Sequence, residues 1–442
     1  MSYRVGLVSL GCEKNRVDAE IMLSSLKDIG YEITSDIETC DIAIVNTCGF
    51  IEASKKESID EIFNLIRLKQ SKKISAIIVT GCLSERYQNE MLKEFPEIDA
   101  AVGIGANKDI VDIVKNVLNG KKVEKFARKD ELPLSGSRVR TTPNHYAYLK
   151  VSEGCNNCCT YCAIPLIRGN FRSRTMEDIL KEARKLAHEG VKELLVIAQD
   201  TTRYGEDIYG KLMLPELLRE LCKIDKIEWI RILYCYPDRI TDELINVIAN
   251  EDKVLKYIDL PLQHCNGRVL KDMNRTGDKK SLSSLLNKIK SKIPNVILRT
   301  TFIVGFPGET DSEFNELCEF SREIGFDRMG CFCYSKEEGT PAASFENQVD
   351  EDIKRHRQQV LMDEQMLVME QKSKNMVGKK IKVLVEGFYD KAECYFGRSY
   401  ADSPDIDGRV YFNDNGKKPK LGDFVDVLVD DFIECDLIGD ML

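Results

Sequence analysis

The chain has 442 residues, with 64 Lys and Arg, 73 Asp and Glu, 16 Cys and a net charge of −9. At roughly 150 residues per domain this length predicts about three domains, and the negative charge disfavours a generic nucleic-acid coat. The longest apolar runs are far shorter than the roughly 18 residues of a membrane span. Charged residues follow soon after the N-terminus, so we expect no secretory leader and no membrane contact. Cysteine-rich chains without a leader are rarely disulfide scaffolds, so we expect a cytoplasmic protein in which some thiolates bind metal.

Residues 1–120 alternate buried strands with amphipathic helices, and this alternation predicts a parallel, doubly wound sheet. The expected strands are Arg4–Leu10, Asp41–Asn46, Ile74–Thr80 and Ala101–Ile104, and the expected helices are Val17–Ile29, Ser54–Leu68, Ser84–Phe95 and Asp109–Leu118. Residues 121–144 are charged, contain Gly and Pro and lack periodicity, which indicates a linker.

The alternation restarts at Tyr146 and continues over residues 145–376. The expected strands are Tyr146–Ser152, Glu193–Gln199, Ile230–Cys235, Tyr257–Leu262, Val296–Val304 and Arg328–Tyr334, and the last helix is Glu351–Lys374. Six such units predict a partial (β/α)6 barrel, in which the loops after the strands form the site. The fold class of the chain is therefore α/β.

Residues 377–442 have a different pattern, with short strands separated by Gly and Asp turns. The expected strands are Lys380–Glu386, Arg409–Phe412 and Asp423–Val429. This pattern predicts a third domain, a small antiparallel β-barrel of the OB-like kind.

The loop after the first barrel strand, GCNNCCTYC at residues 154–162, contains four cysteines. In one interpretation, Cys155/Cys158 and Cys159/Cys162 are the two CxxC pairs of a zinc site. Such pairs are normally separated by roughly 15–20 residues, whereas here they abut. In the other, Cys155, Cys159 and Cys162 form a CxxxCxxC motif (the loop set) and Cys158 is a bystander. Three thiolates on a four-iron cluster leave one iron open, as a catalytic metal requires.

Three dispersed cysteines, Cys12, Cys48 and Cys82 (the N-terminal set), lie just beyond three predicted strands, each with a neighbouring Gly. Because the carboxyl ends of parallel strands share one edge, these loops can converge, and the glycines allow close approach to a bulky ligand. The pattern favours a second metal site over three unrelated buried thiols. An electron carrier with closed clusters would need four cysteines per cluster, and each set has three.

The sequence resembles the radical S-adenosylmethionine (SAM) methylthiotransferases from end to end. The matching segments are SLGCEKNRVDAE at 9–20, NTCGFI at 46–51, TGCL at 80–83, YLKVSEGC at 148–155 and FIVGFPGET at 302–310. That family has an N-terminal three-cysteine domain, a radical SAM barrel and a C-terminal TRAM domain. Within the family, SLGCEKNRVDAE, AQDTTRYG at 198–205 and LPLQH at 260–264 are most similar to the branch that methylthiolates the β-carbon of an aspartate in small-subunit ribosomal protein S-twelve.

The resemblance implies two [4Fe–4S] clusters. The loop set would bind the first, whose open iron takes SAM. An electron from a donor such as flavodoxin or ferredoxin would cleave SAM to a deoxyadenosyl radical that removes a C–H hydrogen. The cluster on the N-terminal set would supply sulfur, which a second SAM methylates. A radical cofactor suits this substrate because an unactivated C–H bond has no useful acidity.

The predicted SAM contacts are Tyr161, Arg174, Gln199, Gly305 and Pro307. In the family, the aromatic residue before the third cysteine lies beside adenine, which implies that role for Tyr161. The glycines around Pro307 could bring backbone to SAM, although a plain strand-to-helix turn explains them almost as well. Gln199 is a polar residue at the barrel rim, and Arg174 either pairs with the SAM carboxylate or is solvated. We interpret His264 as a hydrogen-bonded rim residue rather than a proton shuttle, and no catalytic residue is assigned.

The charge of the last domain separates a protein substrate from the RNA substrate of the sister branch, which modifies adenosine in transfer RNA. Residues 377–442 contain nine basic and fourteen acidic residues, and none of the basic ones follows Leu421. A phosphate-binding module needs clustered Lys and Arg, so RNA binding is not expected. This charge instead suits a basic ribosomal protein.

Overall fold

The computed structural model describes residues 3–442 and divides into two compact units. Unit 1 comprises Met1–Thr141, Lys150–Arg174 and Ser335–Ala343, and unit 2 comprises Thr142–Leu149, Thr175–Tyr334 and Ser344–Leu442. Both cysteine sets therefore belong to unit 1. Over residues 3–442, no helix is at once long and apolar enough to pass through a lipid bilayer.

The N-terminal part of unit 1 is a six-stranded sheet in the order β2-β1-β3-β4-β5-β6. All neighbouring strands in it are parallel, so the prediction of a parallel sheet is confirmed. The strands are β1 (Arg4–Ser9), β2 (Glu32–Thr34), β3 (Ile42–Thr47), β4 (Ala76–Gly81), β5 (Ala100–Val102) and β6 (Val123–Lys125). The sequence reasoning missed β2 and β6, and β6 lies within the segment expected to be a linker.

Helices cover both faces of this sheet, as doubly wound folds require. They are α1 (Glu13–Asp28), α2 (Glu52–Gln70), α3 (Cys82–Tyr87), α4 (Met91–Glu94) and α5 (Ile110–Leu118). Apolar residues of α1 and α5 share one core cluster with the sheet, and those of α2, α3 and α4 share the other. The helix expected at Ser84–Phe95 is broken, because the backbone of Gln88 has φ +35° and a short 3-10 turn, Gln88–Glu90, separates α3 from α4.

Unit 2 contains a second sheet in the order β14-β13-β12-β11-β10-β7. Strands β10 to β14 pair in parallel, in agreement with the predicted six-unit partial barrel. The strands are β7 (Tyr146–Lys150), β10 (Glu193–Ile197), β11 (Trp229–Ile232), β12 (Val254–Asp259), β13 (Ile297–Val304) and β14 (Arg328–Cys333). Its helices are α7 (Met176–His188), α8 (Glu206–Tyr209), α9 (Leu214–Cys222), α10 (Asp242–Asn250), α11 (Gly267–Asp272), α12 (Lys279–Lys292), α13 (Asp311–Ile324) and α14 (Glu351–Lys374).

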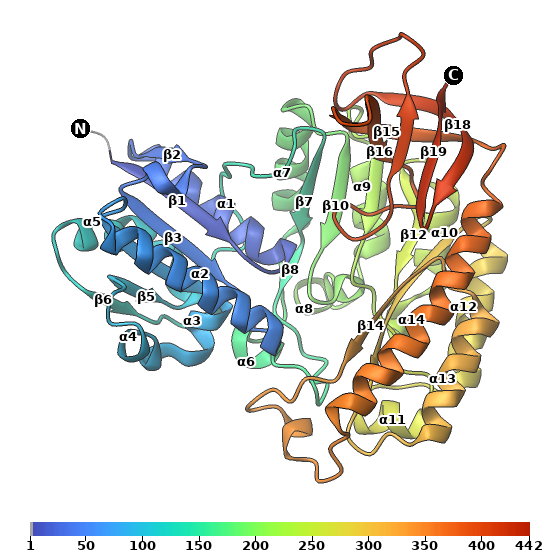
Figure 1. Cartoon of the computed structure of the whole chain (residues 1–442), viewed down its shortest axis with the longest axis horizontal. Helices are drawn as coiled ribbons and strands as arrows, with labels where there is room; N and C mark the ends of the chain where they lie inside the picture. The colour runs from blue at the N-terminus through green and yellow to red at the C-terminus, as the bar shows by residue number, and fades with distance from the viewer. Residues whose placement is uncertain (1–2) are drawn as a thin grey trace. The chain divides into compact units, whose positions relative to one another are not determined.

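The last part of unit 2 is a closed barrel of five strands in the order β15-β16-β17-β19-β18 (Figure 1). Its strands are β15 (Lys380–Tyr389), β16 (Cys394–Arg398), β17 (Val410–Asn413), β18 (Phe424–Ile433) and β19 (Asp436–Met441). The expected barrel is confirmed, with one difference: β17 and β19 pair in parallel, while the other pairs are antiparallel. Alternate residues such as Val383, Val385 and Phe412 fill its interior.

Buried ion pairs attach this barrel to the sheet of unit 2. Arg398 of β16 donates from Nη2 to Glu193 Oε2 of β10 at 2.6 Å, and from Nε to Glu386 Oε1 of β15 at 2.8 Å. Arg231 of β11 donates from Nε to Glu193 Oε1 at 2.8 Å. His145 Nε2 lies 3.1 Å from Glu386 Oε1. Since each carboxylate has a cationic partner, the network satisfies charges that would otherwise be costly to bury.

Candidate functional site

The N-terminal set gathers at one edge of the first sheet. Cys12 is the N-cap of α1, Cys48 directly follows β3, and Cys82 begins α3 directly after β4. A Cβ on Gly11, where φ is +83°, would lie 2.8 Å from Cys48 Sγ, so the first two loops touch. The Asn15 side chain links them further, donating from Nδ2 to Leu10 O at 2.8 Å and to Thr47 O at 3.2 Å.

The three thiols of this set influence one another electrostatically. Burial raises the pKa of Cys82 to about 12, the Arg168 guanidinium opposes that rise, and Cys12 and Cys48 add to it. Burial is also the main cause of the raised pKa of Cys48, and Cys12 raises it further. The raised pKa values of Cys48 and Cys82 keep these two thiols protonated when no metal binds them, whereas a coordinated thiol is deprotonated. Their chemistry fits a metal cluster.

The loop set lies between β8 (Ser152–Glu153) and α6 (Ile164–Arg168). Gly154 has φ +77°, and a Cβ there would overlap the Asn170 carbonyl, so this position requires Gly. Backbone N–H groups point at two of the sulfurs: Asn157 N lies 3.5 Å from Cys155 Sγ, and Ile164 N lies 3.4 Å from Cys162 Sγ. Hydrogen bonds to sulfur are one means by which proteins tune iron–sulfur clusters.

The extra cysteine of this loop differs from its neighbour in exposure. Cys158 is exposed and has φ +50°, whereas Cys159 is buried. An exposed thiol does not face an enclosed cofactor. The difference in exposure therefore favours Cys159 over Cys158 as the partner of Cys155 and Cys162.

Within residues 3–442, no three His, Cys, Asp or Glu side chains converge closely enough to hold one metal ion. A zinc site requires its ligands to meet at a single ion. A four-iron cluster does not, because each thiolate binds a different iron.

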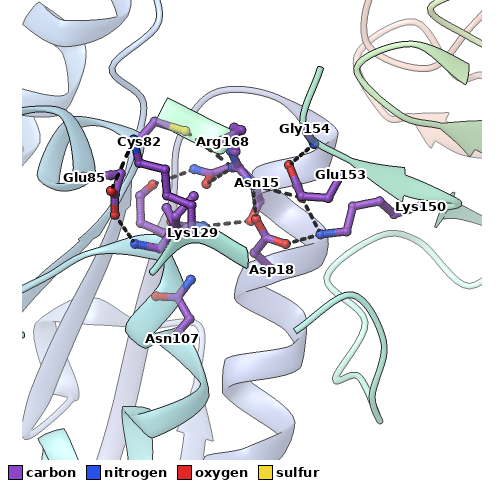
Figure 2. Close-up of polar contacts among 12 residues, drawn as sticks. Asn15, Asp18, Cys82, Glu85, Asn107, Lys129, Lys150, Glu153, Gly154 and Arg168 are labelled. Atoms are coloured by element: carbon purple, nitrogen blue, oxygen red, sulfur yellow. Dashed lines mark hydrogen bonds and ion pairs between the residues drawn. The ribbon is translucent and has the colours of Figure 1, made fainter. Parts of the chain in front are cut away.

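A buried charged network lies against the N-terminal set (Figure 2). Arg168, the last residue of α6, donates from Nη1 to Asp18 Oδ2 at 2.5 Å and from Nη2 to Cys82 Sγ at 3.4 Å. Lys150 pairs with Asp18 and donates to Glu153 Oε2 at 2.9 Å. None of these residues was predicted from the sequence to belong to the site. The available signal was Lys150 and Glu153, two charges within a segment that is otherwise buried and apolar.

The segment Ser335–Ala343 contacts the surroundings of both cysteine sets. Its Glu337 accepts from Arg86 Nη1 at 2.6 Å, and Arg86 also donates to Gly49 O, beside Cys48. Farther along, Ala342 N donates to Thr160 O in the cysteine loop at 3.0 Å. This segment was not expected from the sequence to contribute to the site.

The predicted SAM contacts fall in both units. Tyr161 and Arg174 belong to unit 1, and Gln199, Gly305 and Pro307 belong to unit 2. Tyr161 is half-buried. Arg174 is buried and donates from Nη1 to Lys150 O at 2.7 Å. Gln199 is partly buried, two residues after β10.

The turn at Gly305 and Pro307 is fixed by its own hydrogen bonds. Glu309 Oε2 accepts from Gly305 N at 2.9 Å, and Arg357 Nη1 donates to Glu309 Oε1 at 2.8 Å. Gly305 has φ +68°, and a Cβ there would overlap Lys354. A strand-to-helix turn with a capping box at Thr310 is present, so this part of the motif has a structural reason of its own.

Two other polar residues at this rim are held by neighbours. His264 is fully buried, its Nδ1 accepts from Asn266 N at 2.9 Å, and burial lowers its pKa to about 3. It is therefore neutral near pH 7, as the hydrogen-bonded interpretation requires. Asp200 accepts from Thr202 Oγ1 at 2.6 Å and pairs with Arg239 at 3.2 Å.

Family models match three successive regions: an uncharacterized protein family, UPF0004, at residues 4–103, the radical SAM superfamily at 149–321, and the TRAM domain at 377–442. Curated relatives match nearly end to end. The chain is 51% identical to the ribosomal protein uS12 methylthiotransferase RimO of Caldanaerobacter subterraneus and 49% identical to that of Thermoanaerobacter sp. strain X514, with 99% of each chain covered. The chain belongs to the RimO family.

Further relatives agree with this assignment. The RimO of Clostridioides difficile is 48% identical, again over 99% of both chains. A solved structure of a radical SAM methyltransferase, TsrM from Kitasatospora setae, has a TM-score of 0.58 at 14% identity and covers 77% of this chain and 75% of its own. At that identity the likeness concerns the fold alone, and it agrees with the RimO family's radical SAM region.

Proposed function

We propose that this protein is a radical SAM methylthiotransferase that adds a methylthio group to the β-carbon of an aspartate in ribosomal protein uS12. The observation that supports this proposal most directly is that two separate three-cysteine sets lie in one compact unit of a chain that belongs to the RimO family. Its proposed domains are residues 1–120, 145–376 and 377–442, with 121–144 as a connection. Modification of adenosine in transfer RNA is not favoured, because the matching relatives are named for a ribosomal protein.

In this proposal Cys155, Cys159 and Cys162 hold one [4Fe–4S] cluster, and Cys12, Cys48 and Cys82 hold the other. When bound, the clusters and SAM supply radical chemistry and the transferred sulfur. The chain's own residues hold and shield these groups. The N–H groups of Asn157 and Ile164 donate to the sulfurs of the loop set, and burial around the N-terminal set excludes water from it.

The proposed SAM contacts are Tyr161, Arg174, Gln199, Gly305 and Pro307. Because Gly305 N–H already donates to Glu309, that N–H group is engaged, and the contact of this turn with SAM would involve its carbonyl groups or the apolar surface of Pro307. Arg174 donates from Nη1 to Lys150 O, and a guanidinium is the type of group that pairs with a carboxylate.

We infer that the acidic barrel at residues 377–442 receives the protein substrate. Asp423, Asp426, Asp430 and Asp431 are exposed on or beside β18. Ribosomal proteins are basic, so opposite charge would speed their encounter with this surface, whereas the same charge opposes RNA. A small electron-transfer protein such as flavodoxin or ferredoxin is the proposed reductant, and the cytoplasm, where thiols stay reduced, is the proposed location.

The cysteine assignments are tested with two triple variants of the full chain, reconstituted anaerobically. Wild type should hold about eight iron atoms per chain, the content of two four-iron clusters. Replacing the loop set by Ala should halve the iron and abolish SAM cleavage. Replacing the N-terminal set should also halve the iron but leave reductive SAM cleavage. Full iron in both triple variants would contradict the assignments.

The substrate is tested by mass spectrometry of ribosomal protein uS12 from cells with and without this enzyme. A methylthio mass increment on one aspartate, present only with the enzyme, is the expected result. An unmodified aspartate together with an enzyme-dependent methylthio group on transfer RNA would reverse the choice of substrate.

A further inference from the structure

The Arg168 side chain of unit 1 is almost fully buried, and its guanidinium contacts a cysteine of the N-terminal set. It is 1% exposed and reaches Cys82 Sγ, 86 residues away in sequence, at 3.4 Å. The same Nη2 donates to Asn15 Oδ1 at 3.0 Å. Arg168 therefore contacts a sulfur of the N-terminal set and the side chain that links its loops.

The environment of Arg168 fixes both its position and its charge. Nη1 donates to Asp18 Oδ2 at 2.5 Å and to Glu153 Oε2 at 3.3 Å, and Lys150 balances the same two carboxylates. Figure 2 shows the guanidinium between Cys82 on one side and Asp18 on the other. An arginine cannot lose its proton in a protein, so a permanent positive charge stands beside this sulfur.

The chain position of Arg168 links it to the other set. It ends α6, and the N–H of Ile164, the first residue of that helix, donates to Cys162 Sγ. One short helix therefore begins at a sulfur of the loop set and ends at a sulfur of the N-terminal set. The guanidinium is thus carried by the helix that directly follows the loop set.

We propose that Arg168 is a positioning residue for the N-terminal cluster, which raises the reduction potential of that cluster and slows the loss of its iron. The inference rests on the proposed assignment of Cys12, Cys48 and Cys82 as cluster ligands. Net charge and hydrogen bonds to sulfur set cluster potentials. A cation beside a thiolate stabilises the reduced, more negative state, and it does so strongly where the surroundings exclude water.

The test uses the full chain reconstituted with both clusters and compares Arg168→Gln and Arg168→Lys with wild type. The matched control is Lys150→Met, which removes a buried cation from the same network but one that donates to Asp18 and Glu153 and to no sulfur. The readouts are a redox titration followed by electron paramagnetic resonance, with added SAM identifying the signal of its own cluster, and the rate of iron loss to a chelator.

For Arg168→Gln we expect the reduction equilibrium of the N-terminal cluster to fall about tenfold, equivalent to 59 mV for one electron, and iron loss to quicken several-fold. Arg168→Lys keeps the charge but not the planar guanidinium fork, so the reduction equilibrium of its N-terminal cluster should lie between those of Arg168→Gln and wild type. Lys150→Met should shift the equilibrium by less than half as much as Arg168→Gln. Equal shifts in Gln and Met variants would overturn the inference, because the direct contact would then be irrelevant.

Arg168→Gln removes one of the two cations that pair with Asp18 and Glu153 and is open to misfolding. The double variant Asp18→Asn/Arg168→Gln removes one charge of each sign and should still show the lowered potential, since the sulfur contact is absent; a wild-type potential in it would refute the proposal. Failure of the proposed function is distinguishable, because the Cys12/Cys48/Cys82 triple variant would then retain all of the wild-type iron.

Discussion

Glu386→Gln tests how firmly the acidic barrel is attached within unit 2. The Glu386 carboxylate accepts from Arg398 Nε at 2.8 Å and faces His145 Nε2 at 3.1 Å. Gln has nearly the same shape but no charge, so the variant keeps the packing and removes the ion pair. Arg398 would then retain only Glu193 as an anionic partner.

The loss of stability expected in Glu386→Gln follows from the pKa of the Glu386 carboxyl. Burial alone would raise it, but the hydrogen bond to His145 and the charge of Arg398 outweigh burial and lower it from 4.5 to about 2. At 1.36 kcal/mol per unit this corresponds to about 3 kcal/mol. A depressed carboxyl pKa contributes stability that is complete above the unfolded pKa and lost as pH falls toward the folded pKa. The free energy of unfolding of the variant should therefore be about 3 kcal/mol lower than that of wild type at pH 7. This difference should shrink as the pH falls below 4.5 and vanish near pH 2.

The assays are urea unfolding of both proteins from pH 7 to the acid limit of folding and thermal unfolding at pH 7, each followed by circular dichroism. At roughly 2–4 °C per kcal/mol, the melting temperature of the variant at pH 7 should be about 6–12 °C lower. Glu370→Gln, an exposed position on α14 in the same unit, is the control and should stay within about 0.5 kcal/mol of wild type. A Glu386→Gln variant with wild-type stability at pH 7, or with a deficit independent of pH, would refute the reasoning.

Three further substitutions have definite expectations. Cys158→Ala should keep the iron of both clusters because the thiol is exposed; loss of about half the iron would assign Cys158 a ligand role. Gly305→Ala should lower the free energy of unfolding by about 1–3 kcal/mol, since φ is +68° and Lys354 fills the space of a Cβ, and an unchanged denaturation midpoint would contradict this. Replacing Asp423, Asp426, Asp430 and Asp431 by Asn should slow association with the basic ribosomal protein about tenfold at low salt and less at high salt, as measured by binding kinetics; equal rates at low salt would exclude steering.

The buried strands of the first sheet were predictable because continuous apolar runs are typical of strands covered on both faces. Strands β3 and β4 are buried along their whole length, and both were expected close to their observed ends. The edge strands β2 and β6 have only three residues each, none of which is buried, so neither hydrophobic periodicity nor length distinguishes them from loops.

The convergence of the N-terminal cysteines was also predictable from the sequence. Each cysteine follows the end of a strand, and the carboxyl ends of parallel strands share one edge of the sheet. Arg168 and Glu337 lacked any such signal. Their partners Cys82 and Arg86 are 86 and 251 residues away in the chain, and an isolated Arg at the end of a short helix or Glu in a loop is ordinarily solvated. Only the tertiary fold converts them into buried charges at the site.

The membership of Ser335–Ala343 in unit 1 has a consequence for protein synthesis. The ion pair between Arg86 and Glu337 cannot form until Glu337 has been synthesised, 251 residues after Arg86. At roughly 5–20 residues per second, this delay is about 10–50 s. The first sheet can form soon after its last strand is made, but the region beside Cys48 and Cys82 stays without its final covering until most of the chain has been translated. The nascent protein therefore has an interval in which Arg86 and the backbone beside Cys48 lack the cover that Glu337 supplies.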